Sequence, residues 1–135
     1  MIIDAENLIV GRLASIVAKK ALLGEKIDIV NADKAVIVGR KEGIFEKYKR
    51  QSERGEPFHG PFLPKKPDRL LKRIIRGMLP YKQTRGRDAF KRIKCHIGIP
   101  DELKDKKIIS LEEADVTKTK NLRYINLAKI CEFLG

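Results

Sequence analysis

The segment from Pro67 to Leu79 places the strongest limit on how this chain can fold, because prolines bound it and its side chains divide between two helix faces. Proline suits a first helical turn and Pro80 cannot continue a helix, so the pattern predicts a helix over 67–79. One face is apolar, with Leu70, Leu71, Ile74, Ile75, Met78 and Leu79; the other is basic, with Arg69, Lys72, Arg73 and Arg76. Such a helix packs on a core and offers cations to phosphates or to solvent. A membrane-surface helix would also expose aromatic side chains, which this face lacks.

The N-terminal third alternates between strand and helix patterns. Ile2-Ile3 predicts a short strand, and residues 11–23 predict a helix because apolar side chains recur at three-to-four spacing before Gly24. The runs 27–30 and 35–38 predict two strands with only Asn31 to Lys34 between them, which is too short for a parallel crossover. We therefore expect either a tight antiparallel pair or that one run is not a regular strand. Further on, a polar helix is expected over 42–53 and a strand over 94–98.

Residues 55–66 contain three prolines and two glycines, which exclude a helix or a central strand. A loop of this length in a small domain is usually functional or disordered. Phe58 and Phe62 either pin the loop to the core or stack on bases, and His59 is expected to be the exposed member.

The positive charge is concentrated in the middle of the chain. Residues 34–100 hold 19 Lys and Arg against 6 Asp and Glu, a net of +13, whereas 1–33 and 101–135 are almost balanced. A merely solubilising surface would spread its charge along the chain, so the concentration favours a polyanionic partner. The balanced segment 101–135 is expected to face protein or solvent. Its last helix is expected to pack on the domain through Leu127, Ile130, Cys131 and Leu134.

The run Lys82-Gln83-Thr84-Arg85-Gly86-Arg87 places three cations around one glycine. We expect an exposed turn in which Gly86 lets the backbone approach a phosphate closely. Arg85 and Arg87 offer planar forks that match a phosphate or lie flat on a base. A short helix follows, with Ala89, Phe90 and Ile93 predicted inward and Lys91 and Arg92 outward.

The other classes of protein have weaker support. No apolar run approaches the ~20 residues of a membrane span, and neither a Walker loop nor a dinucleotide fingerprint is present. Cys95 and Cys131 are expected to be reduced core thiols rather than a disulfide, and no Cys or His cluster predicts a metal site. A small nucleotide-binding or RNA-modifying enzyme is the alternative, and a DNA-binding regulator is the second, although no helix-turn-helix or dimer seam is visible.

Several motifs, in the same order, resemble one known family. They are Gly11-Arg12-Leu13-Ala14-Ser15, Val30-Asn31-Ala32-Asp33-Lys34, Gly77-Met78-Leu79-Pro80, Gly86-Arg87-x-Ala89-Phe90-Lys91-Arg92 and a strand ending Gly98-x-Pro100. Together they are similar to the universal L-thirteen family of the large ribosomal subunit, over roughly residues 1–100. The charged tail from Leu111 to Tyr124 resembles the archaeal and eukaryotic branch.

The resemblance implies one α/β domain over 1–135, a three-layer α/β/α fold with a small, mostly parallel four-stranded sheet. It implies a cytoplasmic ribosomal protein that binds large-subunit rRNA during early assembly beside neighbouring ribosomal proteins. No cofactor, metal, membrane or small-molecule substrate is expected. The RNA contacts it implies are Arg40, Lys41, His59, Gly60, Arg73, Arg76, Lys82, Arg85, Gly86 and Arg87. We add the other cations of the basic region, Lys65, Lys66, Arg69, Lys72, Lys91 and Arg92.

Overall fold

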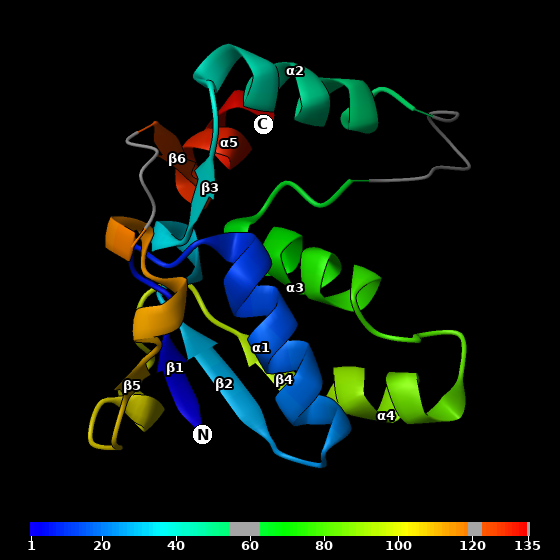
Figure 1. Ribbon diagram of the computed structural model, residues 1–135, viewed down its shortest axis with the longest axis vertical. Coiled ribbons are helices and arrows are strands. Elements are labelled where there is room, and N and C mark those ends of the chain that lie inside the picture. The colour runs from blue at the N-terminus through cyan, green and yellow to red at the C-terminus, as the bar shows by residue number, and fades with distance from the viewer. Residues whose placement is uncertain (55–62, 119–122, 135) are drawn as a thin grey trace.

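The computed structural model describes residues 1–54, 63–118 and 123–134. Its main sheet has four strands in the order β4-β2-β1-β5, and every neighbouring pair is parallel (Figure 1). The strands are β1 (Ile2–Asp4), β2 (Ile27–Val30), β4 (Ile93–Cys95) and β5 (Ile109–Ser110). The expected small α/β fold with a four-stranded parallel sheet is confirmed.

The helices α1 (Val10–Leu22), α3 (Pro67–Gly77) and α4 (Thr84–Lys91) contribute to the core on one face of this sheet. Side chains alternate along a strand, so Ile3, Ile27 and Ile29 point to this face and are fully buried. The other face carries Ile2 and Val30, which form a smaller cluster with Leu103 and Ile108. The layer on that face is therefore thin, because a 3-10 helix, η2 (Asp101–Leu103), supplies it.

The direction of the last crossover explains this second layer. The chain runs from β1 to β2 and then to β4 in one direction, whereas β5 returns to the far side of β1. Connections between parallel strands are right-handed, so a reversal of direction moves the crossover to the opposite face. The segment between β4 and β5 therefore covers Ile2 and Val30.

The amphipathic patterns predicted the ends of helices α1 and α3 to within one or two residues. In α1, Leu13, Val17 and Ala21 are completely buried, as the spacing predicts, and Ile16 is half-buried. Helix α3 buries Leu70, Leu71 and Ile75 but ends at Gly77, two residues before the predicted end. Met78, predicted on the apolar face, lies beyond the helix and is 45% exposed.

The expected relation between residues 27–30 and 35–38 is wrong. Both are strands, but they belong to different sheets, since β3 (Val36–Val38) pairs antiparallel with β6 (Tyr124–Asn126). Asn31 adopts a left-handed conformation with φ of 56°, and η1 (Ala32–Lys34) follows it, which turns the chain out of the main sheet. The Nδ2 of Asn31 donates to Asp4 Oδ1 at 3.0 Å and ties this turn to the end of β1.

A second group of elements lies around β3 and β6. It contains α2 (Lys41–Ser52) and α5 (Leu127–Leu134), whose Phe45 and Phe133 rings stack with centroids 4.5 Å apart. Leu127, Ile130 and Cys131 of α5 belong to the main core cluster, as the spacing in the C-terminal segment predicts. The remaining short elements are η3 (Glu112–Ala114) and η4 (Val116–Lys118). None of the helices in the described ranges is long and apolar enough to cross a membrane.

Candidate nucleic-acid interface

Backbone hydrogen bonds between residues close in sequence form the corner between α3 and α4. Leu79 N donates to Arg76 O at 3.1 Å, and Gln83 N donates to Pro80 O at 2.9 Å. Helix α4 then begins at Thr84, so Gly86 lies in its first turn and is buried. A Cβ at position 86 would overlap the backbone carbonyl of Pro80, so only glycine lets α4 pack this closely on the corner.

This geometry corrects the expected exposed turn over 82–87. The structure has a helix from Thr84, and the missing side chain at Gly86 is explained by packing against Pro80. Arg85 and Arg87 remain exposed in the first turn of α4. Among the described residues, their guanidinium groups bind neutral oxygens: Arg85 Nε donates to Gln83 Oε1, and Arg87 donates to Lys82 O and Thr84 Oγ1, each at 3.3 Å.

Three of the predicted cations are also part of the protein's own packing. Arg92 was expected to point outward, but it is half-buried and its Nη1 donates to Ala21 O in the last turn of α1 at 3.0 Å. Lys72 Nζ lies 4.6 Å from the centre of the Phe90 ring, and Arg76 Cζ lies 4.8 Å from that of Tyr81. These contacts hold the side chains against aromatic rings or a helix end.

The other cations of this region neither stack on a described aromatic ring nor bond to α1. We define the α3–α4 basic face as Lys65, Lys66, Arg69, Arg73, Lys82, Arg85, Arg87 and Lys91. Arg73 is half-buried and the rest are exposed. Within the described ranges, none of them forms an ion pair with a carboxylate. Both helices contact α1, which fixes them in one rigid frame. Cations outnumber carboxylates on these two helices, so the face is positive and its side chains are available to phosphates.

The remaining predicted residues lie elsewhere. Arg40 and Lys41 stand at the start of α2, at the opposite end of the molecule from α4 (Figure 1). There they line a cleft with Lys34, Arg123 and Lys129, which the sequence had not suggested. Arg123 and Lys129 lie in the charge-balanced segment, so no local signal marked them, and only the pairing of β3 with β6 brings them to Arg40. His59 and Gly60 fall outside the described residues.

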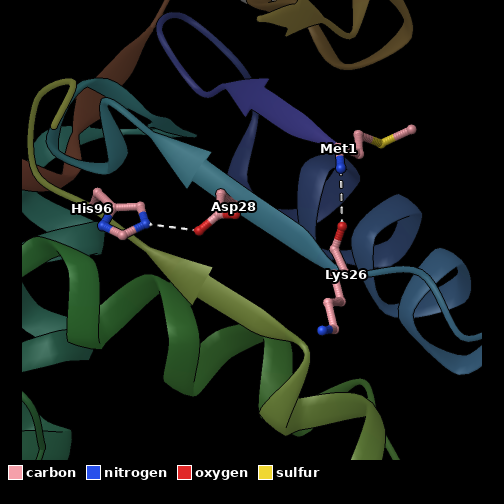
Figure 2. Close-up of polar contacts among 4 residues, drawn as sticks. All are labelled: Met1, Lys26, Asp28 and His96. Carbon is pink, nitrogen blue, oxygen red and sulfur yellow. Dashed lines mark hydrogen bonds and ion pairs between the residues drawn. The ribbon is translucent and has the colours of Figure 1, made fainter. Parts of the chain in front are cut away.

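The two cysteines and His96 are buried or half-buried within the fold. Burial raises the pKa of the Cys95 thiol to about 12 and that of Cys131 to about 11, so neither is a thiolate at neutral pH. Both are free thiols, as expected. His96 Nε2 lies 3.0 Å from Asp28 Oδ1 across β4 and β2, and the Met1 amino group donates to Lys26 O (Figure 2). Among the described residues, no three His, Cys, Asp or Glu side chains form a cluster that could hold a metal ion.

The contact between Arg92 and α1 leads to a stability prediction. Arg92→Met keeps the apolar stem but removes the donor to Ala21 O at the negative end of a helix, so we expect a loss of about 1–2 kcal/mol in the free energy of unfolding. Lys91→Met, at the exposed neighbouring position, should change it by less than about 0.5 kcal/mol. Urea unfolding followed by circular dichroism measures both. Equal stabilities of the two variants would contradict the structural role of Arg92.

Comparison with known proteins identifies the family. A family model described as "Ribosomal protein L13" matches residues 1–102, which is most of the chain. The chain belongs to the ribosomal protein L13 family. The resemblance seen in the motifs is thereby confirmed, and an enzyme is excluded, because L13 proteins are structural proteins of the ribosome.

Several archaeal relatives match almost the whole length of this L13 family member. Proteins named "Large ribosomal subunit protein uL13" from Methanosarcina barkeri and Archaeoglobus fulgidus are 50% and 45% identical. Each match covers 99% of this chain, and 96% and 86% of the respective relatives. A protein of the same name from Methanococcus maripaludis is 45% identical over 100% of this chain and 97% of its own length. The expected archaeal affinity is confirmed.

Proposed function

We propose that this protein is a structural constituent of the large ribosomal subunit and binds large-subunit rRNA through the α3–α4 basic face. One observation supports the choice of this surface: eight cations, five in α3 and α4 and three in the segments beside them, lack a carboxylate partner within the described ranges. Membership of a ribosomal protein family supports RNA as the polyanion. Exposed guanidinium forks at Arg85 and Arg87 suit phosphate oxygens better than point charges do.

The role follows from the chemistry of such a surface. Contacts to phosphates position a protein on folded RNA without reading its sequence, so the protein acts by fixing rRNA shape during early subunit assembly and then remains in place. Neighbouring ribosomal proteins are the second class of partner, and the charge-balanced parts of the surface are suited to them. Neither a small-molecule substrate nor a cofactor is part of this proposal.

Salt dependence tests the proposal. Each neutralised phosphate releases counterions, so the affinity for transcribed large-subunit rRNA should fall steeply as salt rises. We expect the slope of log affinity against log salt concentration to correspond to about 5–10 phosphate contacts. Filter binding over a series of potassium concentrations measures the slope. The protein should also prefer folded rRNA to a random duplex of equal length, because RNA is recognised by shape and by exposed single strands. A slope near zero would rule out the electrostatic account.

A further inference from the structure

A cleft of about 750 Å³ lies between the start of α2 and the start of α5. The antiparallel pair β3–β6 forms one wall, with Val38 opposite Tyr124 and Val36 opposite Asn126. This volume is in the range of pockets that hold one small organic group. The cleft is separate from the α3–α4 basic face and combines residues from the basic middle with residues from the charge-balanced C-terminal segment.

The lining of the cleft is strongly basic. Five cations and two carboxylates border it: Lys34, Arg40, Lys41, Arg123 and Lys129, with Glu6 and Glu42. Lys34, Arg40 and Lys129 are exposed, and the structure gives them no ion pair with any described residue. Helix α2 also begins here without a side-chain cap, which adds the positive end of its dipole. This excess of cations over carboxylates attracts an anionic group.

The cleft also offers groups that recognise a base. Tyr124 lines it and is 46% exposed, although tyrosine usually buries much of its ring. Asn126 Oδ1 accepts a hydrogen bond from Lys129 N at 3.0 Å, which leaves the Nδ2 hydrogens of Asn126 to donate to another acceptor. An acidic peptide would pair with the cations but gains little binding energy from an exposed ring. An unstacked nucleotide gains from both, because its phosphate pairs with the cations and its base stacks on the ring.

We propose that this cleft binds one unstacked nucleotide of single-stranded rRNA. Lys34, Arg40 and Lys129 hold the phosphate, and the base stacks on Tyr124. The proposal rests on the rRNA-binding function proposed above and adds to it a second contact, at the far end of the molecule from α4. It also assigns RNA binding to residues of the charge-balanced segment, for which the sequence predicted only protein or solvent.

Filter binding of transcribed large-subunit rRNA by the full chain tests the phosphate contact. Lys129→Glu should weaken binding about tenfold at 0.15 M salt, because it removes one phosphate contact and adds a repulsive charge. Lys106→Glu makes the same change of charge at an exposed position in the same segment but outside the cleft, and it should stay within about twofold of wild type. If Lys129→Glu binds like Lys106→Glu, the cleft is not an RNA site.

A second pair of variants tests the base contact. Tyr124→Leu removes the ring and should weaken binding by at least about threefold, whereas Tyr124→Phe keeps the ring and should bind like wild type. Thermal unfolding of each variant checks that β6 is intact. If Tyr124→Leu does not fold, photocrosslinking of 4-thiouridine-labelled rRNA to wild type replaces it, and a crosslink to Tyr124 is expected.

The outcomes separate the two proposals. Wild type that shows no salt-dependent rRNA binding overturns the proposed function. Wild type that binds, with Lys129→Glu no weaker than Lys106→Glu, with Tyr124→Leu at wild-type affinity, or with no crosslink at Tyr124, overturns only the cleft proposal. A change in tyrosine fluorescence that Tyr124→Phe abolishes, and that a poly-glutamate peptide saturates at a lower concentration than poly(U) does, would instead assign the cleft to an acidic protein partner.

Discussion

Gly86→Ala is expected to lower the free energy of unfolding by about 2 kcal/mol or more, although alanine normally stabilises a helix. The added Cβ would overlap the carbonyl of Pro80, and the atoms that must move are backbone rather than the end of a flexible side chain. Helix α4 would have to shift away from the corner. That shift would also displace Ala89, which is completely buried in the main core.

Gly43→Ala provides the matched control. Gly43 is also helical, but nothing lies within 4 Å of a Cβ built there. The same substitution should therefore leave stability unchanged or raise it by about 0.5–1 kcal/mol. Urea unfolding of both variants compares the two effects, and only Gly86→Ala should lower the free energy of unfolding. If Gly86→Ala is as stable as wild type, α4 does not pack on Pro80 as described.

Local sequence patterns predicted the elements that form without a specific packing or pairing partner. Helices α1 and α3 follow from apolar spacing alone, because an amphipathic helix needs only some core to pack on. The start of α4 could not be predicted in this way. Its first turn contains Gly86 and two arginines, a pattern that is typical of an open turn. The close packing of Gly86 on Pro80 depends on the three-dimensional structure and cannot be seen in the local sequence.

The error at β3 has a similar cause. The runs 27–30 and 35–38 are neighbours in sequence, so a hairpin was the simplest pairing. Instead, the left-handed Asn31 redirects the chain, and β3 pairs with β6 near the C-terminus. Strand pairing depends on which distant segment arrives beside a strand, and local sequence does not contain that information.

The sequence predicted which residue types form the candidate site. It did not predict which of the cations are exposed and which contact the rest of the protein. The concentration of positive charge in residues 34–100 predicted a polyanionic partner. The cations of the α3–α4 basic face are largely exposed. Yet the sequence could not distinguish exposed Lys91 from its neighbour Arg92, which turns back to the end of α1. It also gave no reason to join Arg40 to Lys129, because their proximity at the cleft depends on β3 and β6.

Charge reversal on the α3–α4 basic face should have the largest effect on RNA binding. Arg69 and Lys82 are both exposed, and within the described ranges neither side chain forms an ion pair or stacks on an aromatic ring. Arg69→Glu together with Lys82→Glu should weaken rRNA binding by more than about tenfold and reduce the salt slope by about two contacts. Lys106→Glu together with Lys107→Glu gives the same net charge and should bind nearly as wild type does. Equal losses in both pairs would show that only net charge matters.

The most direct test of the account is sedimentation of the tagged full-length protein from cells of its source on a sucrose gradient. If the chain is a constituent of the large subunit, wild type should sediment with large subunits and remain with them after a high-salt wash, because buried contacts between charged groups are screened less than exposed ones. The Arg69→Glu, Lys82→Glu variant should be depleted from the subunits, and the Lys106→Glu, Lys107→Glu control should not. Wild-type protein found only at the top of the gradient would contradict the account.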